Sequence, residues 1–119
     1  MTTFVNNKQM TTILKNKDIV TLINVFTVEP ENQQRLMELW VAITEDVMCK
    51  QPGFISANFH KSLDGKYGAN YAQWSSVENI GNMRESIKTN ERYQYLHAEV
   101  LKIAKMNPVL YEVCYTKNL

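Results

Sequence analysis

The sequence predicts a single α+β domain built from strands and amphipathic helices in alternation. Its 119 residues suit one domain, and its 45% hydrophobic content is enough to bury a modest core. Segments with strand-like composition also alternate with segments of helical periodicity along the chain. These observations predict the order strand, helix, strand, strand, one or two helices, strand.

The first predicted strand and helix follow directly on one another. The strand covers Ile19 to Val28, which is rich in β-branched and aromatic residues, and Glu29 to Glu31 interrupts it at a proline. We expect the helix over Pro30 to Lys50, because Pro30 suits a first turn and Gln51 to Gly53 is a stop signal. The helix has an apolar stripe formed by Leu36, Leu39, Trp40, Ile43 and Val47.

The middle of the chain predicts a β-hairpin. Two strand-like runs, Phe54 to Leu63 and Gly68 to Ser75, flank the segment Asp64 to Tyr67. An Asp-Gly pair between two such runs is a strong signal for a tight turn. The hairpin therefore supplies the second and third strands.

Two short helices, or one broken helix, follow the hairpin. Ser75 and Glu78 have the spacing of a capping box for the first, and Thr89-Asn90 is a start signal for the second. Asn107-Pro108 is expected to end the helical region, and Val109 to Thr116 is the last predicted strand.

This element order is ferredoxin-like, with a four-stranded antiparallel sheet and helices on one face. The chain has no further element to cover the other sheet face, so we expect two copies to pair as a homodimer. The predicted domain spans residues 19–119, and residues 1–18 are expected to be a flexible N-terminal extension.

Composition and motifs exclude several classes of function. Thirteen basic and twelve acidic residues give a formal net charge of +1, with no basic block for nucleic acid. No signal peptide or membrane-spanning run is evident, so we expect a cytoplasmic protein without a membrane partner. Cys49 and Cys114 are far apart and are interpreted as reduced packing residues. No nucleotide-binding, zinc-protease or serine-hydrolase motif is present.

Four segments resemble the antibiotic-biosynthesis-monooxygenase-like family of the dimeric α+β barrel superfamily. They are LINVFTVEPENQ, QPGFISANFHKSLDG, NYAQW and PVLYEV, which together span about Ile19 to Thr116. The family includes quinone-forming monooxygenases and haem-degrading enzymes, so the resemblance implies a fold more specifically than a reaction. Its monooxygenase branch implies a small-molecule substrate and no cofactor.

The strongest candidate site lies on the third predicted strand. Alternation places Asn70, Ala72 and Trp74 on one face. An amide and an indole N–H there can bind an oxygenated aromatic ring. In the monooxygenases that this chain resembles, an Asn and a Trp at this spacing line the substrate pocket. The alternative is that Asn70 bonds to the backbone and Trp74 belongs to the core.

Other candidates come from the first strand and the helices. Asn24 is a polar exception in the apolar row that contains Phe26, so it either binds substrate or pairs with a neighbouring strand. The remaining expected substrate contacts are Phe26, Ala72, Met83, Ile87 and Tyr93. Arg84 and Arg92 are expected to flank the pocket mouth, and His60 is interpreted as a surface residue.

His97 is the third catalytic candidate, and three roles remain open for it: proton acceptor, iron ligand or hydrogen-bonded core residue. It lies where the haem-degrading branch has its iron-binding histidine, but Ile87 replaces the tryptophan which that branch has about ten residues earlier. Ile80 and Gln94 stand where well-described polyketide monooxygenases have an assisting tyrosine and arginine.

The sequence thus supports three hypotheses of function. The first is a cofactor-independent monooxygenase that oxidises a small aromatic or quinol-type compound with dioxygen. The second is a non-catalytic dimeric module that binds small molecules or acts in stress responses. The third is a relative of the haem-binding and haem-degrading enzymes, with haem as the cofactor.

Overall fold

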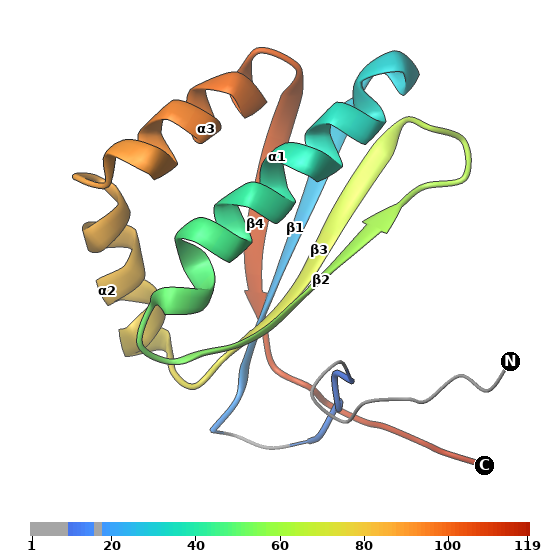
Figure 1. Cartoon of the computed structure of the whole chain (residues 1–119). Coiled ribbons are helices and arrows are strands. Elements are labelled where there is room, and N and C mark those ends of the chain that lie inside the picture. The colour runs from blue at the N-terminus through green and yellow to red at the C-terminus, as the bar shows by residue number, and fades with distance from the viewer. Residues whose placement is uncertain (1–9, 16–17) are drawn as a thin grey trace, which may run out of the picture.

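A four-stranded antiparallel sheet forms the centre of the protein. The structure is a computed structural model that describes residues 10–15 and 18–119. The strands are β1 (Val20–Val28), β2 (Phe54–Lys61), β3 (Tyr67–Trp74) and β4 (Ala104–Tyr111). They lie in the order β2-β3-β1-β4, with antiparallel pairing throughout (Figure 1). This order confirms the predicted ferredoxin-like α+β fold.

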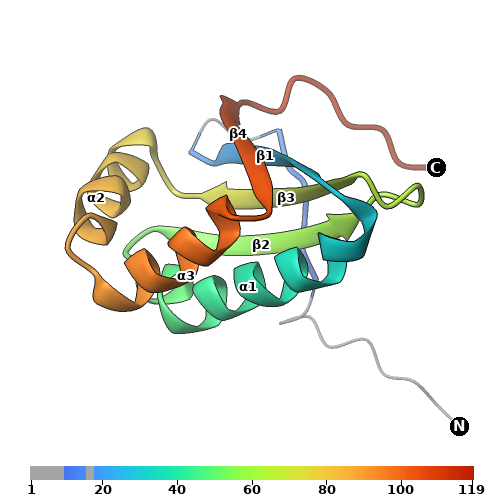
Figure 2. The same ribbon diagram turned by 90° about the horizontal axis from the view of Figure 1, so that it is seen from above.

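The helices pack on one face of the sheet (Figure 2). They are α1 (Gln33–Asp46), α2 (Val77–Ile87) and α3 (Glu91–Leu101). The predicted helix from Pro30 to Lys50 is shorter than expected, because its ends are 3-10 turns, η2 (Pro30–Asn32) and η3 (Met48–Lys50). Val47 separates η3 from α1, since its backbone leaves the helical region at φ −130° while its side chain stays buried.

The predicted hairpin forms, and two glycines fix the ends of β2. Gly65 has φ +80° in the turn, where Asp64 accepts hydrogen bonds from the Lys66 N–H and the Ser62 hydroxyl. Gly53 has φ +86° directly before β2, and a Cβ there would lie 2.5 Å from the Asn79 side chain. Only glycine therefore fits this connection without rearrangement.

Both short helices form as predicted, although one cap differs. Ser76, and not Ser75, is the N-cap of α2, and its hydroxyl accepts a hydrogen bond from the Asn79 N–H at 3.0 Å. Asn90 caps α3 as expected by accepting from the Tyr93 N–H at 2.8 Å. Ser75 instead accepts from the Asn79 side chain, so the cap lies one residue later than predicted.

The last strand corrects the sequence prediction. It covers Ala104–Tyr111 and not Val109 to Thr116, and α3 already ends at Leu101. Asn107-Pro108 therefore lies within β4 and does not end a helix. A proline is tolerated there because β4 is an edge strand that pairs only with β1.

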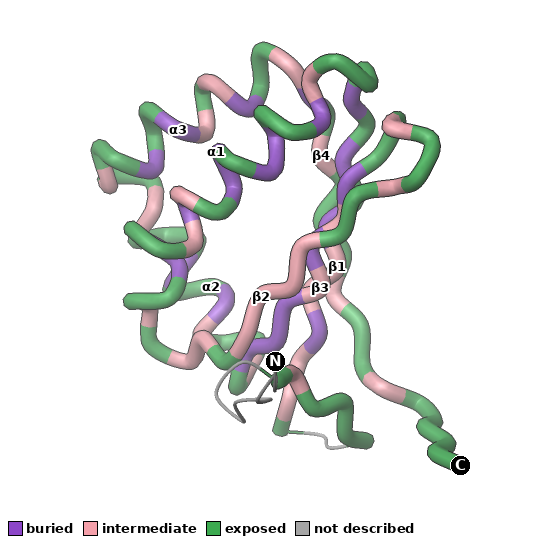
Figure 3. Tube along the Cα trace, turned by 45° about the vertical axis from the view of Figure 1, so that its right-hand side comes forward, coloured by how far each residue is buried: buried purple, intermediate pink, exposed green. Residues whose placement is uncertain are grey.

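The main core lies between the helices and the inner sheet face. Figure 3 shows buried segments on the facing sides of the helices and strands. On β1 the buried positions Asn24, Phe26 and Val28 alternate with exposed ones, which confirms the predicted inward row. The Phe26 and Trp40 rings pack with centroids 5.4 Å apart and join the sheet to α1.

The outer sheet face has two different halves. Residues 10–15, shown in dark blue in Figure 1, lie near the end of the sheet at which β1 begins. The Thr11 hydroxyl donates to the Asn58 side chain at 2.6 Å, and the Gln73 side chain donates to the Thr12 carbonyl at 2.8 Å. The rest of the predicted extension, residues 1–9 and 16–17, lies outside the described residues. On the β1 and β4 side, Val25 and Val109 remain exposed.

Candidate active site

A cavity of about 120 Å³ lies between the inner sheet face and the helices. All four strands and all three α-helices contribute to its wall, together with η3. The described lining residues are Leu22, Asn24, Trp40, Thr44, Met48, Phe54, Ala57, Asn70, Ala72, Trp74, Met83, Arg84, Ile87, Tyr93, Met106 and Pro108. The volume is of the same order as the ~150 Å³ apolar cavity known to hold a benzene molecule, so the space suits a ligand of about one aromatic ring.

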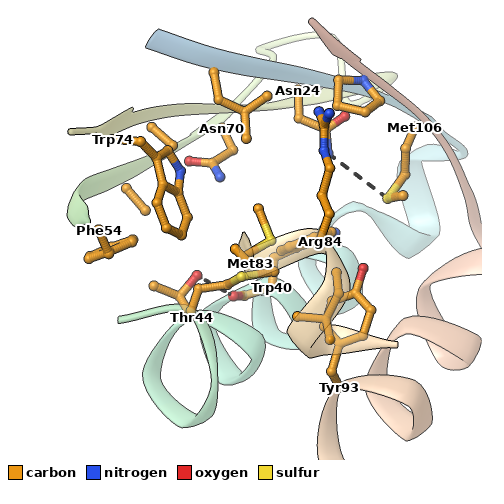
Figure 4. Close-up of a pocket in the computed structure, with 16 residues that line it drawn as sticks. Asn24, Trp40, Thr44, Phe54, Asn70, Trp74, Met83, Arg84, Tyr93 and Met106 are labelled. Atoms are coloured by element: carbon orange, nitrogen blue, oxygen red, sulfur yellow. Dashed lines mark hydrogen bonds between the residues drawn. The ribbon is translucent and has the colours of Figure 1, made fainter. Parts of the chain in front are cut away.

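Asn70 projects from β3 into this cavity (Figure 4). Its Oδ1 accepts a hydrogen bond from the backbone N–H of Asn58 on β2, at 3.2 Å. This bond fixes the amide orientation and leaves the Nδ2 group as the part that faces the cavity. Both interpretations of Asn70 therefore apply. Its oxygen is hydrogen-bonded to the backbone, and its Nδ2 group is a donor in the cavity wall.

Two indole N–H groups lie in the cavity wall without hydrogen-bond acceptors among the described residues. They belong to Trp74 on β3 and Trp40 on α1, and both nitrogens are buried. Figure 4 shows the Trp74 nitrogen on the side of the ring that faces Asn70. The Trp74 ring is held edge-on by Phe54, at 5.5 Å and 88°. An unpaired buried donor is costly, so the Trp74 indole offers a place for a ligand oxygen.

Asn24 repeats the arrangement of Asn70 on the adjacent strand β1, where the two residues are cross-strand partners. Its Oδ1 accepts from the backbone N–H of Asn107 on β4 at 3.1 Å, and its Nδ2 makes only a long contact of 3.9 Å to the Met106 sulfur. The predicted polar exception on β1 thus pairs with a neighbouring strand of its own chain and also lines the cavity. Its donor remains largely available.

The polar groups of the cavity are mostly hydrogen-bond donors. Both asparagine oxygens are occupied by backbone amides, and the Thr44 hydroxyl donates to the Trp40 carbonyl at 2.8 Å. Burial raises the pKa of Tyr93, so its phenol keeps its proton. No carboxylate or histidine lines the cavity among the described residues. The arrangement favours a ligand with acceptor oxygens, such as a carbonyl or a phenolate.

The structure brings most of the predicted site residues together. Seven of them line the cavity: Asn24, Asn70, Ala72, Trp74, Met83, Ile87 and Tyr93. Phe26 is fully buried in the core but is not part of the wall. Arg84 lines the cavity as expected, whereas Arg92 forms an exposed ion pair with Asp46 at 3.0 Å.

His97 also lies outside the cavity wall. Its ring stacks on that of Tyr93 at 5.1 Å, and its Nε2 is buried without a partner in the described structure. Burial lowers the pKa of this imidazole, so His97 is neutral near pH 7. His60 is exposed on β2, in agreement with its interpretation as a surface residue.

Several lining residues were not predicted as contacts. Met106 and Pro108 were missed because the last strand was placed five residues too late. Trp40 was identified only as part of the helical stripe, and Thr44 lies one turn after it on the same helix. The four-residue spacing from Trp40 could have placed Thr44 on the same helix face. The residue type gave no such indication, since threonines are common on helix surfaces.

Two further properties concern the described part of the chain. No helix there is both long and apolar enough to span a membrane. The residues described also contain no cluster of three or more His, Cys, Asp or Glu side chains arranged to hold a metal ion.

The fold and the cavity define a small ferredoxin-like α+β protein with a cavity between its sheet and its helices. The sequence profile described as antibiotic biosynthesis monooxygenase matches residues 19–86. The tetracenomycin-F1 monooxygenase of Streptomyces glaucescens is 36% identical over 107 residues, which cover 90% of this chain and 92% of that protein. The chain belongs to the antibiotic biosynthesis monooxygenase family, as the resemblance implied.

Solved structures share the fold. SnoaB, a cofactor-independent oxygenase from Streptomyces nogalater, superposes with a TM-score of 0.64 at 20% identity, over 83% of this chain and 96% of SnoaB. A protein from Shewanella loihica PV-4 gives a TM-score of 0.66 at 31% identity, over 82% of this chain and 96% of that protein. The architecture is therefore shared across distant sequences.

Proposed function

We propose that the protein is a cofactor-independent monooxygenase that converts a small electron-rich phenol or quinol-type compound to a quinone. The observation that carries this proposal is the donor-rich cavity, in which the Asn70, Asn24 and Trp74 donors surround an apolar space. Donors fixed in a dry cavity stabilise an oxyanion better than water does, because they need no reorganisation. The names of the relatives support the same reaction class.

The reaction needs no reductant besides the substrate. An ionised phenol donates electrons to dioxygen, one oxygen atom replaces the para C–H hydrogen as a carbonyl, and the other leaves as water. Phenol plus O₂ thus gives p-quinone plus H₂O. In this proposal Asn70 and Trp74 donate to the phenolate oxygen, and Ala72, Met83 and Ile87 exclude water from the ring. Since no base lines the described wall, these donors favour a substrate that is itself acidic.

His97 remains a predicted proton acceptor with weaker support. It contacts Tyr93 but is not part of the cavity wall, so direct proton transfer from a bound phenol would require it to move. The same position weakens the haem hypothesis, because an iron ligand must face the haem.

Oxygen consumption with an Asn70 variant tests the proposal. The wild type should oxidise members of an anthrone and phenol panel without added cofactor. Asn70→Asp keeps an acceptor for the Asn58 N–H and replaces the donor with an oxygen, so turnover should fall about 10-fold to about 1,000-fold. Wild-type enzyme that binds these compounds but consumes no oxygen would refute the proposal. That result would favour the hypothesis of a non-catalytic binding module. The lack of a carboxylate or histidine among the described lining residues also supports this second hypothesis.

We also propose that the working form is a homodimer. On the outer sheet face, exposed Val25, Val109 and Tyr111 join the half-buried Ile23 and Tyr71. We call these five residues the outer-face patch. Apolar groups gathered on an open sheet face favour burial against a partner, and a second copy presents the same surface in an isologous contact.

A further inference from the structure

The cavity wall contains one charged residue among those described, Arg84. It forms no ion pair in the described structure, whereas Arg92 pairs with Asp46 and Lys88 pairs with Glu85 on the surface. No described lining residue is acidic. Arg84 is exposed at the edge of the cavity, so solvent balances its charge until an anionic ligand replaces that solvent.

Two neighbours on α2 place Arg84 next to the cavity. Met83 is buried beside it, and Ile87, one turn later, also lines the cavity. Figure 4 shows the Arg84 side chain extending toward the β1 side of the cavity, where Asn24 lies, while Trp74 lies at the other end. Asn70 is the cross-strand partner of Asn24, so the two amides lie between the guanidinium and the Trp74 indole.

Building on the proposed function, we propose that Arg84 binds a carboxylate on the aromatic substrate, on the side of the ring away from the Trp74 indole and at a carbon other than the para carbon that is oxidised. The planar guanidinium can hold a carboxylate through two parallel hydrogen bonds. The Asn24 Nδ2 is a further donor in the same cavity wall. The site thus selects aromatic acids that have both a phenol and a carboxylate.

A matched ligand pair tests this selection without turnover. 3-Hydroxybenzoate and 3-hydroxybenzamide share a phenol with a free para carbon and differ in the charge of the second substituent. Under anaerobic conditions at about pH 7, calorimetric titration should show that the wild type binds the benzoate at least about 10-fold more tightly. The chain has two tryptophans, Trp40 and Trp74, and both line the cavity, so fluorescence quenching gives a second readout.

Variants assign the preference to Arg84. Arg84→Gln should abolish the benzoate preference and leave benzamide binding nearly unchanged. Arg84→Lys should retain part of the preference, because lysine keeps the positive charge but lacks the two parallel N–H donors of the guanidinium. Arg92→Gln is the matched control, since Arg92 lies on the surface, and it should keep the wild-type preference. Equal binding of both ligands, binding of neither, or a preference that survives in Arg84→Gln would overturn the inference. Failure of oxygen consumption alone would overturn only the proposed reaction.

Discussion

Trp74→Phe separates a role in catalysis from a role in packing. The indole nitrogen is buried without an acceptor, so the substitution removes an unsatisfied donor, whose burial costs about 1–3 kcal/mol. This gain offsets the packing lost when the smaller ring leaves a gap beside Phe54. We expect a net change in the free energy of unfolding within about 1 kcal/mol, which corresponds to a melting shift under about 8 °C.

The effect on turnover should be much larger. A hydrogen bond to a charged oxygen contributes about 1.5–3 kcal/mol, so its loss should reduce kcat/KM by about 10-fold to about 150-fold. The assay is oxygen consumption on phenol and anthrone substrates, measured beside thermal melts of the same preparations. Leu36→Ala is the packing control, because Leu36 is fully buried outside the cavity wall, and it should lose about 2–5 kcal/mol of stability. Unchanged turnover in Trp74→Phe with a large melting loss would refute the reasoning.

Three further predictions concern assembly, cofactor and pH. Light scattering with gel filtration should give a dimer mass that Val109→Glu reduces to a monomer, and a wild-type monomer at micromolar concentration would contradict the proposed pairing. Haem should bind weakly without being degraded, because His97 is not part of the cavity wall and Ile87 replaces the expected tryptophan; a Soret band lost under reductant would reverse this. Burial holds the pKa of His97 below its ordinary value of 6.5, so the unfolded state binds more protons and stability should fall as pH decreases below 6.5. Melts across this range should lose that slope in His97→Gln but keep it in His60→Gln.

The sequence predicted the fold well because each element has a strong local signal. The apolar row on β1, the stripe on α1 and the Asp-Gly turn all agree with the observed architecture. β4 was misplaced because Asn107-Pro108 is locally a stop signal, and only pairing with β1 makes proline acceptable there. Propensity rules act within a few residues, whereas an edge position is a property of the whole sheet.

The candidate site was predictable where strand alternation decides the direction of a side chain. Asn70, Trp74 and Asn24 follow from that alternation. His97 does not, because a helix residue on the apolar stripe can face either the cavity or the neighbouring helix. The orientation of the asparagine amides was also beyond sequence reasoning, since it depends on backbone N–H groups of other strands.

The hydrogen bonds accepted by the Asn70 and Asn24 side chains connect the cavity to the backbones of the two edge strands. The Asn70 oxygen accepts from the backbone of Asn58 on β2, and the Asn24 oxygen accepts from the backbone of Asn107 on β4. A ligand that draws on either Nδ2 group polarises its amide and thereby alters the hydrogen bond on the far side. The ¹⁵N resonances of Asn58 and Asn107 should therefore shift on binding, each for its own asparagine, so that one spectrum shows which of the two amides a compound contacts.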